Sequence, residues 1–279
     1  MRYGLNLFLW TTDVRDEHLP LIEGVREYGY DGVELPIGST MSSRPERLRE
    51  ALDDAGLACT TMTNVGAERH TASPDPTVRQ RALDELRFAI DASHTMGSET
   101  LVGPYQAAYA YFTGSGPTEE ELDWSAEILR TASEEAAAAG LRLAVEFLNR
   151  HEGYLLNTME QSADLARRVD HPAFGVLYDT HHAHAEEDDV AAAIGGGMDH
   201  IYEVHFSESN RGSLGAGLVD WDATCAALRD GGYDGWIVAE AFAHDVPGLS
   251  SAAHVWRSTF PSKDEFARTA IGFMRERMG

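Results

Sequence analysis

The segment LRLAVEFLNRHEGYLLNTMEQSADLARRVD, residues 141–170, contains one complete unit of the pattern that decides the fold of this chain. Residues 141–147 are mostly apolar, which predicts a buried strand, and residues 158–170 have the pattern of a helix. A strand followed by a helix in this way is the repeating unit of parallel sheets. One residue does not fit a buried strand, because Glu146 places a carboxylate inside it.

The same alternation extends in both directions along the chain. With 141–147 included, we predict strands near 4–9, 31–35, 57–63, 99–103, 141–147, 174–178, 200–206 and 236–240. With 158–170 included, we predict helices near 16–29, 43–56, 75–97, 118–140, 158–170, 188–196, 221–231 and 262–277. Several of these helical stretches are followed by a glycine, which commonly ends a helix: Gly29, Gly56, Gly97 and Gly140.

Eight strand–helix units in 279 residues predict a (β/α)8 TIM barrel, with residues 1–279 forming a single domain. The alternative is a doubly wound open sheet, which would usually carry a glycine-rich turn after its first strand. The corresponding segment here, LFLWTTDV at 7–14, has no glycine. In a barrel, the loops that follow the strands meet at one face. We therefore expect the irregular stretches 104–117, 207–220 and 241–261 to surround the active site.

The composition excludes several kinds of partner. The formal net charge is −24, and Lys263 is the only lysine, so the chain would repel the phosphates of nucleic acid. No run of 18 apolar residues occurs, and we expect no membrane helix. The N-terminal segment lacks the features of a secretory signal. The two cysteines, Cys59 and Cys225, form no CxxC motif, and we therefore expect a cytoplasmic protein without disulfides.

Four consecutive predicted strands each end near a residue that can bind a metal ion. Glu146 ends the strand at 141–147, and the next three strands reach Asp179, His205 and Glu240. A single carboxylate in such a place commonly caps a helix or pairs with an arginine. Four such residues in successive strands favour a shared metal site, because the strand ends of a barrel lean toward one axis.

The ligand set also indicates the kind of metal. Three carboxylates and one imidazole suit Mn²⁺, Mg²⁺ or Co²⁺ better than a structural zinc ion, which would recruit cysteines. Three carboxylates placed close together would otherwise repel one another and take up protons. The same face carries Glu152, His182 and Arg211, which could contact the hydroxyls of a small polar ligand. We expect Phe8 and Trp10 to cover its apolar faces.

At these residues the chain resembles the ketose 3-epimerases, such as D-tagatose 3-epimerase and D-psicose (D-allulose) 3-epimerase, in the xylose-isomerase-like barrel superfamily. The most specific part of the resemblance is VEFLNRHEGYLLNT at 145–158. It extends to YDTHHAHAEED at 178–188, VHFSESNRG at 204–212 and VAEAF at 238–242. Departures include His181, where the family pattern leads us to expect phenylalanine, and the aromatic segment at 104–117.

The resemblance implies roles for these residues. Glu146, Asp179, His205 and Glu240 look like the ligands of one divalent metal ion per subunit, most often Mn²⁺ and otherwise Co²⁺ or Mg²⁺. Glu146 and Glu240 also look like the pair of catalytic acid/base residues. Glu152, His182 and Arg211 match the substrate-binding positions. The resemblance further implies an isomerase that acts on a small sugar as a homodimer or homotetramer.

The expected reaction is epimerisation at C3 of a free ketose through an enediolate, with one glutamate removing the proton and the other returning it to the opposite face. The sequence leaves the ketose open among D-tagatose, D-fructose or D-psicose, and a ketopentose. An aldose–ketose isomerase, for example one resembling hydroxypyruvate isomerase, remains the alternative at the same metal site. A metal-dependent hydrolase and a non-catalytic sugar-binding barrel are more distant alternatives. The strong negative charge counts against a hydrolase acting on nucleic acid.

Overall fold

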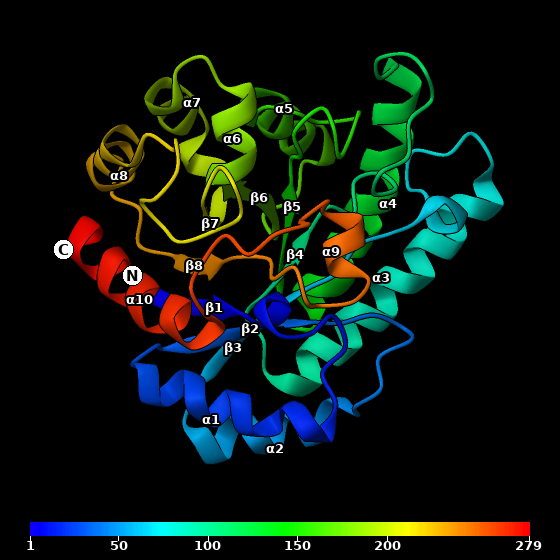
Figure 1. Cartoon of the computed structure of the whole chain (residues 1–279). Coiled ribbons are helices and arrows are strands. Elements are labelled where there is room, and N and C mark those ends of the chain that lie inside the picture. The colour runs from blue at the N-terminus through cyan, green and yellow to red at the C-terminus, as the bar shows by residue number, and fades with distance from the viewer.

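The computed structural model, which describes residues 1–279, is a closed barrel of eight parallel strands in the order of the sequence. Figure 1 shows the strands at the centre with the helices around them. The predicted TIM barrel is therefore confirmed. The strands are β1 Arg2–Asn6, β2 Gly32–Pro36, β3 Ala58–Met62, β4 Thr100–Gly103, β5 Arg142–Glu146, β6 Phe174–Asp179, β7 Ile201–Ser207 and β8 Trp236–Glu240.

The helices cover the outside of this ring. They are α1 Leu19–Tyr28, α2 Pro45–Ala55, α3 Pro76–Met96, α4 Glu119–Ala138, α5 Met159–Val169, α6 Thr180–Glu186, α7 Val190–Gly197, α8 Trp221–Asp230, α9 Leu249–Ala252 and α10 Lys263–Met278. Short 3₁₀ turns occur at η1 Leu7–Leu9, η2 Asp16–His18, η3 Ala67–Arg69 and η4 Met198–His200. No helix has the length and apolar character needed to cross a membrane.

Local signals in the sequence fix where several helices begin and end. The carboxylate of Asp75 accepts a hydrogen bond from the backbone N–H of Thr77 at 2.8 Å, and Pro76 opens α3. Gly97 ends this helix with a φ of 73°, a conformation that glycine adopts without steric cost. At α4, Thr118 and Glu121 form a reciprocal capping box.

The first strand begins and ends earlier in the chain than the sequence predicts. Residues 4–9 were expected to be extended, but β1 ends at Asn6 and Leu7–Leu9 form η1. The side-chain oxygen of Asn6 accepts a hydrogen bond from the backbone N–H of Phe8 at 2.7 Å, and this contact turns the chain. A short apolar run cannot distinguish a strand from a helical turn, because both bury such residues.

The sixth unit and the last loop contain helices that the sequence pattern did not predict. We predicted one helix near 188–196, but α6 precedes α7, and the side chain of Asp179 caps α6 by accepting from the backbone N–H of His181. The only acid of α6 is Glu186, in a polar stretch that by its composition would face solvent. The Glu186 side chain is instead only 5% exposed and pairs with Arg150. The stretch 241–261 contains the short helix α9.

The register of the strands decides which side chains face the inside of the barrel. Side chains alternate along a strand, so Glu146 and Ala144 share the inner face of β5. The pairing carries this face to Val102 on β4 and Met62 on β3, and these side chains with Leu177 form a small apolar layer inside the barrel. At the first residues of the strands, the buried Trp236 ring would lie 2.5 Å from a side-chain carbon at Gly32, so that position requires glycine.

Candidate active site

The four predicted metal ligands lie at one end of the barrel. Glu146, Asp179 and Glu240 are the last residues of β5, β6 and β8, and His205 pairs in register with Asp179. Each is at most 3% exposed. Their strands follow one another around the ring, so the closed barrel turns four distant positions of the sequence into neighbours.

These residues form two overlapping groups. Asp179, His205 and Glu240 each offer an atom within 4.8 Å of the other two, and Glu146, Asp179 and His182 do the same. Asp179 therefore belongs to both groups, whereas Glu146 approaches the centre beside His182. That all four hold one ion stays a prediction.

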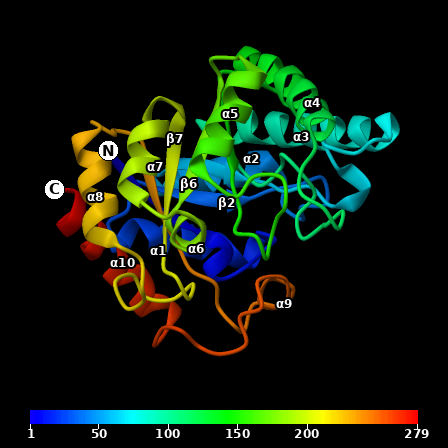
Figure 2. The ribbon, with the colours of Figure 1, turned by 90° about the horizontal axis from the view of Figure 1, so that it is seen from above.

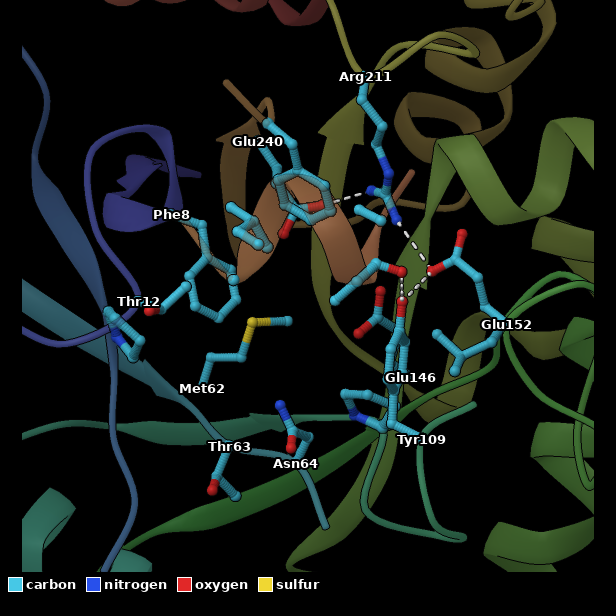
Figure 3. A pocket seen from close by; sticks show the side chains of 18 of the residues that line it. Phe8, Thr12, Met62, Thr63, Asn64, Tyr109, Glu146, Glu152, Arg211 and Glu240 are labelled. Carbon is cyan, nitrogen blue, oxygen red and sulfur yellow. Dashed lines mark hydrogen bonds and ion pairs between the residues drawn. The ribbon is translucent and has the colours of Figure 1, made fainter. Parts of the chain in front are cut away.

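The guanidinium of Arg211 lies between Glu240 and Glu152, as Figure 3 shows, and also contacts Asp179. Its Nη1 is 3.0 Å from Asp179 Oδ2, 2.5 Å from Glu240 Oε2 and 2.9 Å from Ser207 Oγ. Arg211 has a φ of 57°, in the left-handed region that residues other than glycine seldom adopt. Its guanidinium also stacks on Phe242, 4.4 Å from the ring centre. The strained backbone thus turns a loop residue into the barrel, as is common at functional sites.

The buried charges strongly affect one another. Burial raises the pKa of Glu146 well above its ordinary value, and the charges of Asp179 and Glu240 raise it further. Burial alone would raise the pKa of Asp179 as well, but Arg211 and His182 hold it below its ordinary value. The crowding of buried carboxylates thus favours the protonated form of Glu146, whereas Arg211 and His182 favour the ionised form of Asp179.

The donor set fits a divalent cation. Neither ring nitrogen of the buried His205 has an aligned hydrogen-bond partner, although Nε2 lies 3.0 Å from Glu34 Oε1 and Nδ1 lies 3.6 Å from Glu240 Oε1. A histidine that binds a metal commonly directs its other ring nitrogen to a carboxylate, as Nε2 faces Glu34 here. The free Nδ1, with Asp179 and Glu240 beside it, offers the hard oxygen and imidazole ligands that Mn²⁺, Mg²⁺ or Co²⁺ accept.

The predicted substrate-binding residues border the same space. Glu152 accepts hydrogen bonds from Asn149 Nδ2 at 2.8 Å and Tyr109 Oη at 3.0 Å. Nδ1 of His182 accepts from the backbone N–H of Asn149 at 2.9 Å, so the neutral ring carries its hydrogen on Nε2. That Nε2 lies 3.3 Å from Glu146 Oε1. Burial lowers the pKa of His182, and the nearby charge of Arg211 lowers it further.

A cavity of about 340 Å³ opens from these groups to the surface. One end is charged and contains Glu146, Glu152, His182, Arg211 and Glu240. The other end is neutral and includes Phe8, Thr12, Ile37, Met62, Thr63 and Asn64. Figure 3 shows Arg211 and Glu152 across the space from Thr12, Met62 and Thr63, with Glu240 toward the side of Phe8. Phe8 thus lies where the sequence predicted an aromatic wall, whereas Trp10 does not line the cavity because η1 turns it elsewhere.

The long loops form the mouth of the cavity. The hydroxyl of Tyr109, in the 104–117 stretch, contacts both Glu152 Oε2 and the backbone oxygen of Ala252 in α9, the latter at 3.3 Å. In Figure 2, α9 projects away from the ring of helices, on the side of the loops that follow the strands. The stretches 104–117 and 241–261 therefore both contribute walls of the cavity, through Tyr109 and Leu249.

Sequence reasoning missed three buried polar residues beneath the site. They are Asn6 on β1, Glu34 on β2 and Glu203 on β7, each at most 1% exposed. Glu34 and Glu203 lie within reach of His205. For the two glutamates the sequence does contain a signal, because each is an acid inside an apolar strand: GVELP at 32–36 and IYEVHF at 201–206. The same signal identified Glu146 as a candidate site residue.

Comparison with known proteins finds a family model and several sugar epimerases that are similar to this chain. The model of the family described as xylose isomerase-like TIM barrel matches residues 22–277. A ketose 3-epimerase of Arthrobacter globiformis is 29% identical over all of this chain and 97% of its own length. A probable ketose 3-epimerase of Synechocystis sp. is 26% identical, covering 99% of this chain and 96% of its own length.

A solved structure agrees with these relatives. The D-allulose 3-epimerase of Methylomonas sp., in complex with D-allulose, superposes with a TM-score of 0.91. It is 26% identical and covers 99% of this chain and 97% of its own. The comparisons confirm the resemblance to ketose 3-epimerases that the sequence motifs indicate, and these relatives are isomerases, the enzyme class that we predicted.

Proposed function

Since the chain belongs to the xylose isomerase-like TIM barrel family, we propose that it catalyses the metal-dependent epimerisation of a free ketose at C3. The observation that carries this proposal is the placement of two buried glutamates, Glu146 and Glu240, in one cavity. They come from β5 and β8, which two other strands separate, and each is at most 3% exposed. Two carboxylates on different sides of a bound sugar can act on the two faces of one carbon.

The cavity favours an uncharged sugar. Arg211 is the only arginine that lines it, no lysine does, and the Nη1 atom of Arg211 is already bound by Asp179 and Glu240. A phosphate group would need free cationic or backbone donors. The neutral end instead offers the hydroxyls of Thr12 and Thr63 and the amide of Asn64, beside the apolar Phe8 and Met62. These groups suit the hydroxyls and carbon skeleton of a ketose.

The proposed reaction breaks and remakes one carbon–hydrogen bond. One glutamate takes the C3 proton, and the electron pair moves into a C2–C3 double bond while the C2 oxygen gains negative charge. The other glutamate returns a proton to the opposite face of C3, and the C2 carbonyl forms again. No oxidant or reductant is needed. Both carboxylates must come within about 3 Å of the proton they transfer.

The remaining residues bind and orient the sugar. The Nε2–H group of His182 and the guanidinium of Arg211 donate to the oxygens near C2, and Glu152 accepts from a hydroxyl at the same end. A divalent ion held by Glu146, Asp179, His205 and Glu240, for which we propose Mn²⁺, would stabilise the negative charge that develops on the sugar oxygens. Tyr109 and Leu249 form walls at the mouth of the cavity and limit the access of water to the bound sugar.

The test is a substrate panel on chelator-treated protein. D-tagatose, D-fructose, D-psicose, L-ribulose and hydroxypyruvate are each incubated with added Mn²⁺, Co²⁺ or Mg²⁺, and the products are separated by chromatography. We expect a C3 epimer from at least one ketose, no product without a divalent ion, and the highest rate with Mn²⁺. Conversion of hydroxypyruvate, or an aldose product from a ketose, would replace epimerisation by aldose–ketose isomerisation. Equal rates with and without metal would reject the metal site.

Two further features belong to the proposal. We propose that the enzyme works in the cytoplasm, because its two cysteines are buried and free and its charge favours solubility. We also propose a homodimer or homotetramer, which the resemblance implies. Sedimentation velocity at several protein concentrations measures the second feature, and a monomer at all concentrations would contradict it.

A further inference from the structure

Asn6 connects the start of the chain to the site. Its side-chain oxygen accepts from the backbone N–H of Phe8 at 2.7 Å, and this contact directs the amide nitrogen into the barrel. That nitrogen lies 2.7 Å from Glu34 Oε1 and 3.1 Å from Glu240 Oε1. The side chain is 1% exposed. Only one orientation of the amide is possible, because the reverse would place its oxygen against two carboxylates.

Glu34 holds Asn6 in this place. Its Oε1 accepts from Asn6, and its Oε2 accepts from the hydroxyl of Thr60 at 3.1 Å. Glu34 pairs in register with Asn6 on one side and with Thr60 on the other. A continuous chain of contacts therefore runs from β3 through β2 and β1 to Glu240 on β8. It crosses the seam at which the first and last strands close the barrel.

The two glutamates of the cavity differ in their support. Glu240 is held at Oε1 by Asn6 and at Oε2 by Arg211. Glu146 has no such pair of donors: Nε2 of His182 lies 3.3 Å from its Oε1, and the nearby Asp179 is another acid. A carboxylate with a fixed donor on each oxygen has one orientation, and proton transfer depends steeply on such orientation.

We propose that Asn6 is a positioning residue that fixes the carboxylate of Glu240 for proton transfer on one face of the sugar. The inference rests on the proposed function, because it assigns Glu240 to one face and Glu146 to the other. Loss of the Asn6 amide then impairs one proton transfer and spares the other.

The test uses Asn6→Leu and Asn6→Asp. The aspartate keeps an acceptor for the Phe8 N–H group but removes the donor to Glu240. We expect kcat for epimerisation to fall roughly 10- to 100-fold in both variants, with KM little changed, as for the loss of a hydrogen bond to a charged group. In deuterated water, exchange at C3 should fall for only one epimer, the one that Glu240→Gln also affects. The other epimer should exchange at the wild-type rate.

Thr61→Val is the matched control. Thr61 is also fully buried on β3, but its hydroxyl faces outward, 2.7 Å from Ser93 Oγ. This variant should keep wild-type rates for both epimers. If the Asn6 variants do not unfold cooperatively, Thr60→Val replaces them, since it removes a support of Glu34, and the same epimer should lose exchange. A wild-type kcat in Asn6→Asp, or equal loss of exchange in both epimers, would overturn the proposal.

A second readout separates this proposal from the proposed function. A wild-type protein that epimerises no ketose would reject the function. The link between Asn6 and Glu240 is then measured by calorimetric titration with Mn²⁺. We expect Asn6→Leu to bind the ion about 10-fold more weakly than wild type, as is typical when a residue that supports a ligand is lost. Equal affinities for Asn6→Leu and wild type would overturn the role of Asn6.

Discussion

The ends of β5 and β8 place similar carboxylates in very different surroundings. Glu240 has a donor on each oxygen, Asn6 on one side and Arg211 on the other. Glu146 faces His182 at 3.3 Å, and burial raises its pKa well above the ordinary value. Hydrogen bonds from neighbouring side chains thus fix the orientation of the Glu240 carboxylate. For Glu146, the main effect of the surroundings is the loss of water, which raises its pKa. Two proton-transfer groups of the same residue type need not be equivalent.

The largest effect is expected from removing each carboxylate in turn. Glu146→Gln and Glu240→Gln should each lower epimerisation by about 10²- to 10⁴-fold, the usual contribution of a general acid or base. In deuterated water each variant should keep exchange without inversion for one epimer, and the two variants should keep it for different epimers. Glu160→Gln, on the exposed face of α5, is the control. Full epimerisation in either variant would contradict the assignment of two separate bases.

Replacing Arg211 should remove much of the support of Glu240. Arg211→Met leaves Asp179 and Glu240 buried without their shared partner, so the free energy of unfolding should fall by about 3 kcal/mol. Urea unfolding in the presence of a chelator measures this change, and added Mn²⁺ should reduce it. Arg47→Met, which breaks an exposed ion pair with Glu50, should cost less than about 1 kcal/mol. Equal losses in the two variants would show that Arg211 is not a structural counter-charge.

Glu208 organises the loop that carries Arg211. Burial alone would raise its pKa, but hydrogen bonds from the backbone of Ser209, Val219 and Gly215 and from the Trp221 ring lower it below the ordinary value. A lowered folded-state pKa stabilises the protein above the unfolded-state value of about 4.3, and this stability is lost as the pH falls through the folded-state value.

Glu208→Gln should therefore lower the free energy of unfolding at pH 7 by about 1–2 kcal/mol. The difference from wild type should shrink as the pH falls below the unfolded-state value of about 4.3 and through the lowered folded-state value. Urea unfolding of both proteins from pH 3 to pH 7 measures the two curves. Parallel curves over the whole range would mean that the carboxylate charge of Glu208 does not support the loop.

The smallest effect is expected at Tyr109, which touches neither glutamate of the pair. Tyr109→Phe removes the hydroxyl that joins Glu152 to α9, a loss of about 1 kcal/mol. KM should rise roughly 5-fold, with kcat nearly unchanged and both epimers affected equally. Steady-state kinetics on both epimers give the answer. A fall in kcat confined to one epimer would link Tyr109 to proton transfer instead of sugar binding.

The candidate site was predictable where its residues interrupt a strong pattern. Glu146 lies in an apolar strand, and Asp179, His205 and Glu240 lie at or near the ends of the three strands that follow, so the barrel brings them to one place. Glu34 and Glu203 are also acids in apolar strands, but the sequence pattern does not mark them as residues of the site. Both lie in the interior of their strands, where no general rule distinguishes a buried structural acid from a ligand.

Other features had no local signal. The residues Leu7 to Leu9 are as apolar as a strand, and only the capping contact of Asn6 reveals the turn that keeps Trp10 out of the cavity. Arg211 lies in a polar loop, where composition alone hardly distinguishes an exposed side chain from one that contacts a ligand. It enters the barrel because its left-handed backbone and the carboxylates of Asp179 and Glu240 hold it there.

The sequence by itself determined the eight alternating units, the face on which the loops gather and the strand ends that carry acids. Those properties depend on apolar periodicity and helix caps, which are local. Only the tertiary structure decided which donors each acid receives. Asn6 and Glu240 are 234 positions apart, and they meet because the first and last strands pair when the barrel closes. Hydrogen bonds act over about 3 Å, so the contacts that distinguish Glu240 from Glu146 exist only after closure.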